Sequence, residues 1–309
     1  DTRGAHQRAW CLGQSVATSN AVPPIPTLEE SYAYCARLAR SHYENFTITS
    51  WLTPQKLRPA LQTIYAFCRH TDDLGDEASG DRTALLNHWR NELSLVYTGS
   101  PTHPVMVALQ DVVHRFEIPD APFNKLIRAN EMDQESGVFQ TYDDLLIYCD
   151  HSANPVGRMV LRVLGDRTEE SSRLSDATCT ALQLANFWQD VKRDRDKGRL
   201  YIPLDDIHRF NYSTEELAAG IANQAFRDLM RFEVERAQAL FIQGLELVDR
   251  LHGMPKLDVA LFSRGGMTVL DSIRAQNYDV LSKRPTVTKS RKLILLATTG
   301  ERLAMRTSL

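Results

Sequence analysis

Apolar residues recur every three or four positions along most of the chain, which is the spacing of one buried face of an α-helix. The clearest single stripe consists of Phe226, Met230, Val234, Ala237, Phe241, Leu245 and Val248. No stretch shows the alternation of apolar and polar positions that a half-buried β-strand requires. The periodicity predicts helices over residues 28–43, 54–76, 83–97, 102–116, 120–138, 142–164, 171–195, 214–250 and 256–282. We therefore expect an all-α protein.

Several of these helices begin with residues that cap a helix N-terminus. Thr27–Glu30, Thr141–Asp144 and Ser213–Glu216 each place a hydroxyl three residues before a carboxylate. In that arrangement the hydroxyl accepts a hydrogen bond from a free backbone amide, and the carboxylate reaches back to the amide of the capping residue. Thr53-Pro54 is a further helix start of the same kind.

The chain divides by composition into three parts. Residues 1–26 mix small, polar and proline residues without a helical period, which is typical of a flexible leader. Residues 27–285 contain no linker, no break in composition and no repeat, so we expect a single helical domain there. Residues 286–309 form a C-terminal tail.

Composition and charge exclude several classes of protein. The 309 residues are 43% hydrophobic and 24% charged, with a net charge of -3 and no basic cluster that could follow a nucleic acid. The longest uninterrupted apolar run, Leu293–Ala297, is far shorter than the roughly 20 residues of a membrane-spanning helix. The cysteines are odd in number and scattered, which argues against disulfides and zinc: Cys11, Cys35, Cys68, Cys149 and Cys179. We expect a cytoplasmic protein, either soluble or bound peripherally at the inner face of a membrane.

An acidic motif follows the segment Tyr65–Arg69, which reads YAFCR. Asp72 and Asp76 are four residues apart, so in a regular helix they share a face and lie about 6 Å apart along the axis. Their like charges repel, and a cation would relieve that repulsion if the face is buried. The alternative interpretation is a solvated acidic helix end.

A second acidic motif precedes the segment Gly198–Pro203. Asn186, Asp190 and Asp194 stand at positions i, i+4 and i+8, which places three oxygen donors on one stripe of a helix. Carboxylate and amide oxygens are hard ligands that suit Mg²⁺, which also keeps positions open for water and phosphate. The alternative is an ordinary charged surface helix.

The two motifs and their flanking segments together resemble the squalene and phytoene synthase family of head-to-head prenyl synthases. One family motif reads DxxxD after a YAFCR-like segment, and the other reads QxxNxxxDxxxD and leads into GRxYxP; both are present here. The resemblance implies an all-α isoprenoid-synthase bundle in which the motifs face each other at the mouth of a deep apolar cavity and bind Mg²⁺ and diphosphate.

The resemblance also implies roles for individual residues. The Mg²⁺ site would comprise Asp72, Asp73, Asp76, Asn186, Asp190 and Asp194. The substrate diphosphate would be bound by His42, Arg69, Gln183, Arg199 and Lys283, with Arg284 as the alternative to Lys283. Arginine suits this task because its planar guanidinium donates two parallel hydrogen bonds.

Two segments depart from the common family pattern. Glu44 and Asn45 stand in a segment where the family often has lysine and serine, and Ser152–Pro155, which reads SANP, replaces a small apolar VAG sequence. These departures resemble the branch of bacterial hopanoid biosynthesis that makes hydroxysqualene from presqualene diphosphate. A polar group in an apolar cavity can hold an ordered water.

The resulting candidates for catalysis fall into two sets. Tyr65 and Tyr148 would stabilise cationic intermediates through their ring faces. Asn45, Ser152 and Asn154 would position the water that captures the cation. The alternatives are core packing for the tyrosines, and a helix kink or cap before the proline that follows Asn154.

We therefore expect an Mg²⁺-dependent enzyme of transferase or lyase type that ionises presqualene diphosphate and quenches the cation with water, without NADPH. One alternative is head-to-head condensation of two prenyl diphosphates to presqualene diphosphate, squalene or phytoene. Another, from a different class, is a non-catalytic assembly protein of the same fold. The sequence leaves open the chain length of the substrate and the oligomeric state.

Overall fold

The computed structural model describes residues 25–41, 54–135, 137–287 and 299. Within these residues every named element is a helix, and extended backbone pairs only in an isolated bridge between Val138 and Leu200. The predicted all-α class is confirmed. Nearly all of the predicted leader and tail lie outside the described residues, as does the segment with His42, Glu44 and Asn45.

Backbone contacts divide the chain into two compact units. The first runs to Gln134 and includes Arg162–Gly165, and the second comprises Glu135–Leu161 and the chain from Asp166 onward. The predicted domain boundaries at residues 27 and 285 stay predictions.

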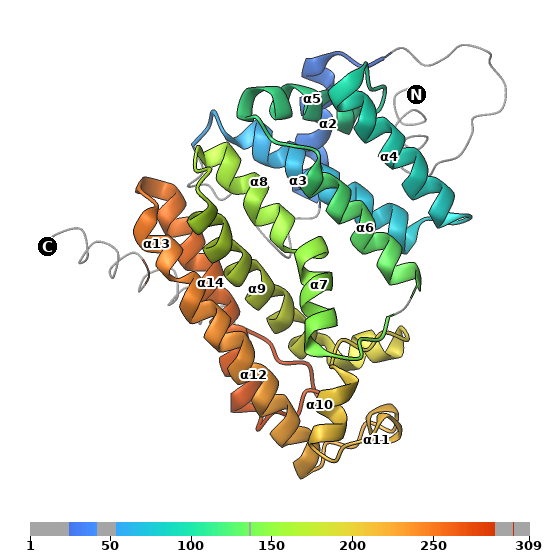
Figure 1. Ribbon diagram of the computed structural model, residues 1–309, viewed down its shortest axis with the longest axis vertical. Helices are drawn as coiled ribbons and strands as arrows, with labels where there is room; N and C mark the ends of the chain where they lie inside the picture. Colours follow the sequence, from blue (N-terminus) through green and yellow to red (C-terminus); the bar gives the residue numbers. More distant parts are fainter. Residues whose placement is uncertain (1–24, 42–53, 136, 288–298, 300–309) are drawn as a thin grey trace, which may run out of the picture. The chain divides into compact units, whose positions relative to one another are not determined.

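The first unit is built from helices that surround α3. Its elements are α2 (Leu28–Ser41), α3 (Arg58–Asp72), the π-helix η1 (Asp73–Glu77), α4 (Arg82–Thr98), α5 (Pro104–Phe116) and α6 (Ala121–Glu135). Helix α2 packs on α3 and α5, and α4 packs on α5 and η1 (Figure 1). Helix α3 continues directly into η1, so the packing of α3 determines where the first acidic motif lies.

Aromatic packing fixes the C-terminal half of α3. The ring of Phe67 stacks on Trp89 at a centroid distance of 5.6 Å and meets the ring of Phe123 edge-on at 5.0 Å. The indole Nε1 of Trp89 donates to Oγ1 of Thr71 at 2.9 Å, which satisfies the polar atom of a fully buried ring. These contacts hold the last turn of α3 in place.

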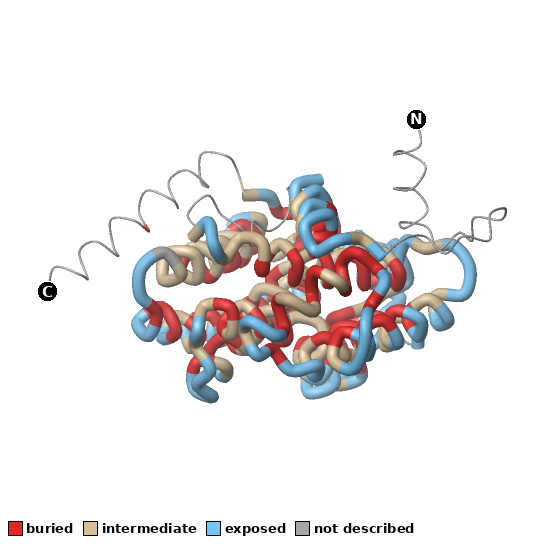
Figure 2. The backbone as a smooth tube through the Cα atoms, turned by 90° about the horizontal axis from the view of Figure 1, so that it is seen from above, coloured by how far each residue is buried: buried red, intermediate tan, exposed pale blue. Residues whose placement is uncertain are grey.

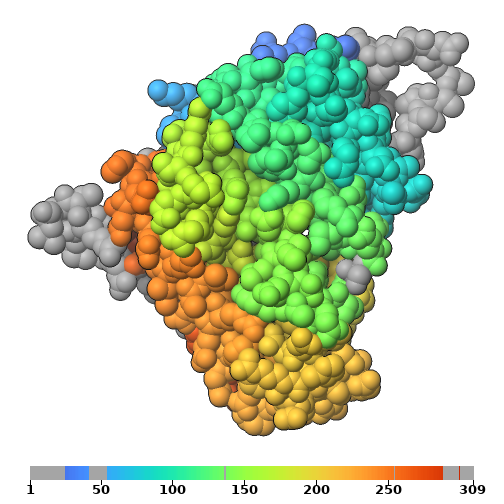
Figure 3. Space-filling view, viewed as in Figure 1, coloured from blue at the N-terminus to red at the C-terminus, as the bar shows by residue number. Residues whose placement is uncertain are grey.

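The second unit is arranged around the long helix α9. Its elements are α7 (Tyr142–Ser152), α8 (Asn154–Leu164) as far as Leu161, α9 (Glu169–Asp196), α10 (Leu204–Arg209), α11 (Thr214–Ala218), α12 (Gln224–Gly244), α13 (Glu246–Arg250) and α14 (Gly253–Ala275). Helix α9 packs against α7, α12, α13 and α14. Figure 3 shows α10 and α11 (yellow) gathered beside α12 (orange) at one end of this unit.

Close helix packing in the second unit depends on two glycines. A Cβ on Gly244 would lie 2.1 Å from Oγ1 of Thr178 on α9, and one on Gly266 would lie 2.2 Å from the ring of Phe241. Real Cβ atoms do not approach other atoms this closely, so these positions require glycine. Buried positions alternate with exposed ones along the helices (Figure 2), as an amphipathic pattern predicts.

Three of the four predicted helix starts agree with the structure, whereas the start predicted at Thr53-Pro54 is wrong because α3 begins at Arg58, with Leu57 as its N-cap and no side-chain cap. Full capping boxes are present at Thr141 with Asp144 and at Ser213 with Glu216. Thr27 and Glu30 exchange the same reciprocal hydrogen bonds.

Several predicted helix boundaries are wrong. The predicted helix 142–164 breaks at Ala153, and the one predicted over 214–250 is three helices. The first of its two breaks arises because Gly220 takes a φ of +73° and Asn223 caps α12. The helix predicted over 256–282 ends at Ala275. None of the described helices is long and apolar enough to span a membrane.

Candidate functional site

The first acidic motif lies where α3 changes into a π-helix. The amide of Ala78 donates to the carbonyl oxygen of Asp73 at 2.9 Å, which is the i to i+5 bond of a π turn. Asp72 ends the regular helix, whereas Asp76 lies in the wider turn. The regular helix predicted through both residues is therefore wrong. Single π turns inside α-helices occur often at functional sites.

Two amide side chains of α6 hold this turn. Nδ2 of Asn130 donates to Oδ1 of Asp72 at 3.3 Å, and Nε2 of Gln134 donates to the carbonyl oxygen of Gly75 at 2.8 Å. A Cβ on Gly75 would lie 2.2 Å from Oδ1 of Asn130, so the close approach of α6 requires glycine. Neither amide was predicted as a site residue from the sequence, where their i, i+4 spacing is the only signal.

Charged side chains of the first motif interact within one helical segment. Nη2 of Arg69 lies 2.5 Å from Oδ1 of Asp73 and 2.9 Å from Oε1 of Glu77. The pKa of Asp72 is raised, first because surrounding protein displaces solvent and then because Asp76 and Asp73 repel its charge. The side chain of Asp72 is itself exposed, so residual solvent screening limits that rise. Arg69, a predicted diphosphate ligand, contacts the acidic motif in this structure.

The second acidic motif lies near the C-terminal end of α9, where the helix is regular. Asn186, Asp190 and Asp194 therefore share one face, as predicted. The pKa of Asp194 is raised to about 6, first by burial and then by the negative charge of Asp190. A divalent cation would relieve this repulsion. One amide oxygen and two carboxylates are hard oxygen donors, and Mg²⁺ typically binds a few such protein ligands and completes its shell with water.

Asp190 is bound by Arg284, which follows α14. Nε of Arg284 donates to Oδ1 of Asp190 at 2.6 Å, and Nη2 donates to Oδ2 at 2.7 Å. Lys283, the predicted diphosphate ligand, is exposed. Of the two alternatives left by the sequence, the structure brings Arg284 to the second motif.

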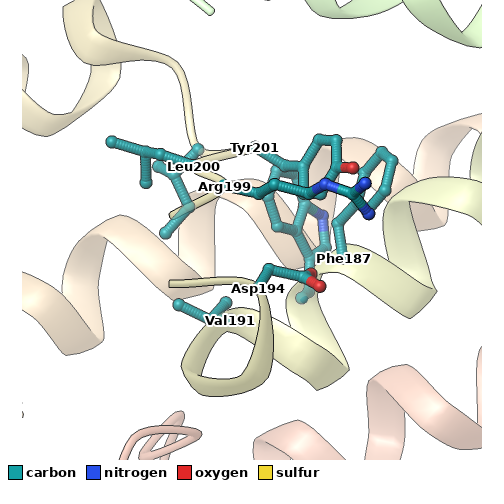
Figure 4. A pocket seen from close by; sticks show the side chains of 8 residues that line it. Phe187, Val191, Asp194, Arg199, Leu200 and Tyr201 are labelled. Atoms are coloured by element: carbon teal, nitrogen blue, oxygen red, sulfur yellow. The ribbon is translucent and has the colours of Figure 1, made fainter. Parts of the chain in front are cut away.

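A small pocket lies beside Asp194 (Figure 4). Its lining consists of Phe187, Trp188, Val191, Asp194, Arg199, Leu200, Tyr201 and Ile202. The rings of Phe187 and Tyr201 stack at a centroid distance of 3.7 Å and an angle of 6°. Arg199, a predicted diphosphate ligand, and Asp194, a predicted metal ligand, therefore line one pocket whose other walls are apolar or aromatic.

The turn that carries Arg199 is held by the chain preceding α7. The amide of Leu200 donates to the carbonyl oxygen of Gly137 at 2.5 Å, and Val138 forms the isolated bridge with Leu200. A Cβ on Gly137 would lie 3.2 Å from Cα of Arg199, which is tighter than most such contacts. The backbone of Arg199 is thus positioned by a segment more than sixty residues earlier in the sequence.

Tyr148 belongs to an aromatic cluster that extends from this pocket. Its ring centroid lies 5.3 Å from that of Phe139, 5.8 Å from Tyr201 and 6.2 Å from Phe187. The side chain is buried with 5% exposure. The other predicted catalytic tyrosine, Tyr65, is half-buried on α3 in the first unit.

Ser152 and Asn154, the polar side chains where α7 meets α8, differ in their hydrogen bonding. Oδ1 of Asn154 accepts a hydrogen bond from the hydroxyl of Thr180 on α9 at 2.9 Å, so Asn154 ties α8 to α9. The hydroxyl oxygen of Ser152 is buried and has no hydrogen-bond partner in the part of the chain that the structure describes. The break at Ala153 confirms the predicted kink before Pro155. Ser152 has hydrogen-bonding capacity that the fold does not use.

The remaining candidates are placed as follows. Gln183 is half-buried on α9, one turn before Phe187. His42 and Asn45 lie outside the described residues. In the part of the chain that the structure describes, no group of three or more His, Cys, Asp and Glu side chains converges as a metal-binding cluster would. An Mg²⁺ site on α9 would accordingly use the amide oxygen of Asn186 beside two carboxylates.

The chain belongs to the squalene/phytoene synthase family, whose family model matches residues 39–291. The match covers both acidic motifs and the aromatic pocket, and it confirms the resemblance found in the sequence. This family consists of enzymes that process prenyl diphosphates, and its common reaction is head-to-head condensation.

Individual relatives and solved structures agree with this class. The chain is 32% identical to 15-cis-phytoene synthase of a Synechocystis species over 295 residues, covering 90% of this chain and 87% of that protein. It is 32% identical to phytoene synthase of Arthrospira platensis, covering 87% and 92% respectively. The crystal structure of squalene synthase HpnC from Alicyclobacillus acidocaldarius matches with 43% identity and a TM-score of 0.79, covering 81% of this chain and 95% of that one. A dehydrosqualene synthase structure matches with 25% identity and a TM-score of 0.82, covering 90% and 98%.

Proposed function

We propose that this protein ionises presqualene diphosphate and captures the resulting cation with water to form hydroxysqualene. The main support is the 43% identity to squalene synthase HpnC, whose name points to a C30 product. The polar segment Ser152–Pro155, which resembles the hydroxysqualene-forming branch, supports the same reaction.

Ionisation would depend on Mg²⁺ held by each acidic motif. Asp72 and Asp76, with Asp73, would hold Mg²⁺ in the first unit. Asn186, Asp190 and Asp194 would hold it in the second. When bound, the cations would neutralise the charge that develops on the diphosphate leaving group. The raised pKa of Asp194 supports this role, because it reflects burial of the carboxyl and repulsion from Asp190, and a bound cation would offset both.

Arginine side chains would orient the diphosphate. Arg199 lies beside Asp194 in the aromatic pocket, which supports its assignment to this task. Arg69, His42, Gln183 and Lys283 stay candidates for the same role. The guanidinium would act as a fixed donor pair for phosphate oxygens.

The cation would then be held among rings and captured by one water. Tyr148 lies in a cluster of four aromatic rings, and ring faces attract positive charge. The unpartnered hydroxyl of Ser152 could hold the water, because buried polar groups normally have a partner. Asn154 is already bound to Thr180 and is the weaker candidate. Tyr65 and Asn45 stay candidates.

Head-to-head condensation is the second candidate function. The 32% identity to phytoene synthases over nearly the whole chain favours it. In that case the protein would consume two prenyl diphosphates and Ser152 would have no role in capturing water.

Product analysis separates the two reactions. The protein would be incubated with Mg²⁺ and either presqualene diphosphate or farnesyl diphosphate, without NADPH, and the products analysed by mass spectrometry. We expect an alcohol from presqualene diphosphate, with ¹⁸O in the hydroxyl when the reaction runs in labelled water. A hydrocarbon as the main product, or a requirement for NADPH, would exclude the hydroxysqualene assignment.

A further inference from the structure

The carboxylate of Asp190 is bound on both oxygens by one guanidinium. Arg284 donates from Nε at 2.6 Å and from Nη2 at 2.7 Å, which is the strong, bidentate form of an arginine–carboxylate pair. Arg193, one turn along the same helix, reaches only Oδ1 at 3.5 Å, and its side chain is 67% exposed. Arg284 is therefore the closer counter-ion of Asp190 among the described residues.

Arg284 also anchors the segment that follows α14. Its Nη2 donates to Oε1 of Gln189 at 3.1 Å, and Nε2 of Gln189 donates to the carbonyl oxygen of Pro285 at 2.7 Å. At the other end, Nη1 of Arg227 donates to the carbonyl oxygen of Asn277 at 2.5 Å. Residues 277–285 thus form a strap that is fastened to α12 at its start and to the second acidic motif at its end.

We propose that Arg284 and a divalent cation compete for Asp190, so that metal binding at the second acidic motif releases the end of the strap. This inference rests on the proposed metal role of Asp190. It assigns to Arg284 the role of a positioning residue that holds the carboxylate and yields it to the metal.

The competition follows from charge rather than from a lack of acceptor positions. A carboxylate has about four acceptor sites, so a second donor could still approach Asp190. Mg²⁺ or Mn²⁺, however, requires a ligand oxygen at about 2.1 Å. A guanidinium that stays hydrogen-bonded to the same carboxylate would place a further positive charge within a few ångströms of the ion, where Coulomb repulsion is strong in a partly buried site. Loss of the pair with Arg284 therefore accompanies strong metal binding.

Measurement of Mn²⁺ affinity tests this competition directly. Free Mn²⁺ would be quantified by electron paramagnetic resonance during titration of the full-length chain, without diphosphate. We expect Arg284→Gln to bind Mn²⁺ about tenfold more tightly than the wild type, because the competing cation is gone. A gain in affinity also cannot result from unfolding.

Arg193→Gln is the matched control, because it removes the same charge near the same carboxylate. Its exposed, long contact predicts less than about a threefold change in Mn²⁺ affinity. An Arg284→Gln variant that binds Mn²⁺ no more tightly than Arg193→Gln would overturn the competition.

A third variant separates this inference from the proposed function. Asp194→Asn should weaken Mn²⁺ binding strongly if α9 carries a metal site. If the wild type binds no Mn²⁺, or if Asp194→Asn binds it equally well, both the metal role and the competition are wrong. If Asp194→Asn loses binding while Arg284→Gln shows no gain, the metal role stands and the competition fails.

Hydrogen–deuterium exchange supplies a readout that does not depend on affinity. In the wild type, saturating Mn²⁺ should accelerate exchange in the strap near Arg284. In Arg284→Gln, exchange there should already be fast without metal and should change little when metal is added. Unchanged or slower exchange in the wild type on adding Mn²⁺ would contradict release of the strap.

Discussion

At the scale of single residues, some acidic side chains stabilise the fold through ion pairs and others do not. Asp194 has a raised pKa, and the described residues form no ion pair with it that would explain its presence beside an aromatic pocket, whereas Arg158 and Asp176 form a partly buried pair that joins α8 to α9. Placing the Asp194 carboxylate in a partly buried site near Asp190 is unfavourable for folding. A role as a cation ligand explains its presence better than a contribution to stability does.

Asp194→Asn should therefore leave the fold intact and lower turnover by about 10²–10³-fold, because it removes anionic charge from the proposed metal site. The rate would be measured as diphosphate release at limiting Mg²⁺, with circular dichroism as the folding control. Asp72→Asn tests the first motif in the same way. Full activity of either variant would contradict the metal assignment.

Ser152→Ala should change the product rather than the rate of ionisation. Removal of the buried hydroxyl would leave the water without its hydrogen-bond partner. Loss of a proton from the cation would then compete better with capture by water, and hydrocarbon would increase at the expense of alcohol. The ratio of the two products, measured by mass spectrometry, reports this directly. Thr180→Val is the control, since it releases Asn154 and leaves Ser152 in place. An unchanged ratio in Ser152→Ala would remove this residue from the proposed mechanism.

At the scale of helices, amphipathic periodicity was sufficient for elements that bury one long face. The stripe from Phe226 to Phe241 is buried on α12, as predicted. Periodicity failed where an element is shorter than two turns: α10 has six residues and was not predicted. It also missed η1, because a π turn changes the hydrogen-bonding partner without changing which residue types occur.

The candidate site was predictable where it depends on local spacing. Asn186, Asp190 and Asp194 share a face of α9 because the helix is regular. The pair between Arg284 and Asp190 joins residues 94 positions apart, and local patterns carry no information on such a contact. The same holds for Asn130, which reaches Asp72 from another helix.

Adjacent glycines on α14 provide a test of helix packing. Gly266→Ala should destabilise the protein by about 1–3 kcal/mol, because the added Cβ would lie 2.2 Å from Phe241 and 2.9 Å from Leu182. Gly265→Ala meets no atom within 4 Å and should stabilise by up to about 1 kcal/mol through helix propensity. Urea unfolding of both variants measures the difference. Equal effects would show that α14 does not pack on α12 as described.

At the scale of the whole molecule, one buried carboxyl affects how stability depends on pH. Glu233 is fully buried, and the described residues supply no hydrogen-bond donor to either of its oxygens. The charged groups around it are Arg236, whose Nη1 lies 3.7 Å away, and Asp206, which binds Arg236; Arg236 also lies over the ring of Tyr142. Burial raises the pKa of Glu233 to about 8.

A raised carboxyl pKa means that the folded state holds this proton more tightly than the unfolded state, where the pKa is about 4.5. Glu233 therefore lowers the free energy of unfolding as the pH rises from about 4.5 to about 8, and its contribution is constant above that range. Glu233→Gln should remove this dependence and be more stable than the wild type at pH 8.5 by about 2 kcal/mol. Urea unfolding of both proteins at pH 5, 7 and 8.5 measures this difference in stability. Parallel pH profiles for the two proteins would show that Glu233 stays charged in the fold.

The π turn at Asp73–Glu77 also has an evolutionary consequence. Such a turn contains one residue more than a turn of regular helix, so a single-residue deletion would convert it to α-helix that continues α3. A deletion between Asp72 and Asp76 would leave these carboxylates three residues apart instead of four, and the chain would still fold. Such a variant is therefore expected to keep the architecture and to lose turnover, because the spacing of the proposed metal ligands has changed.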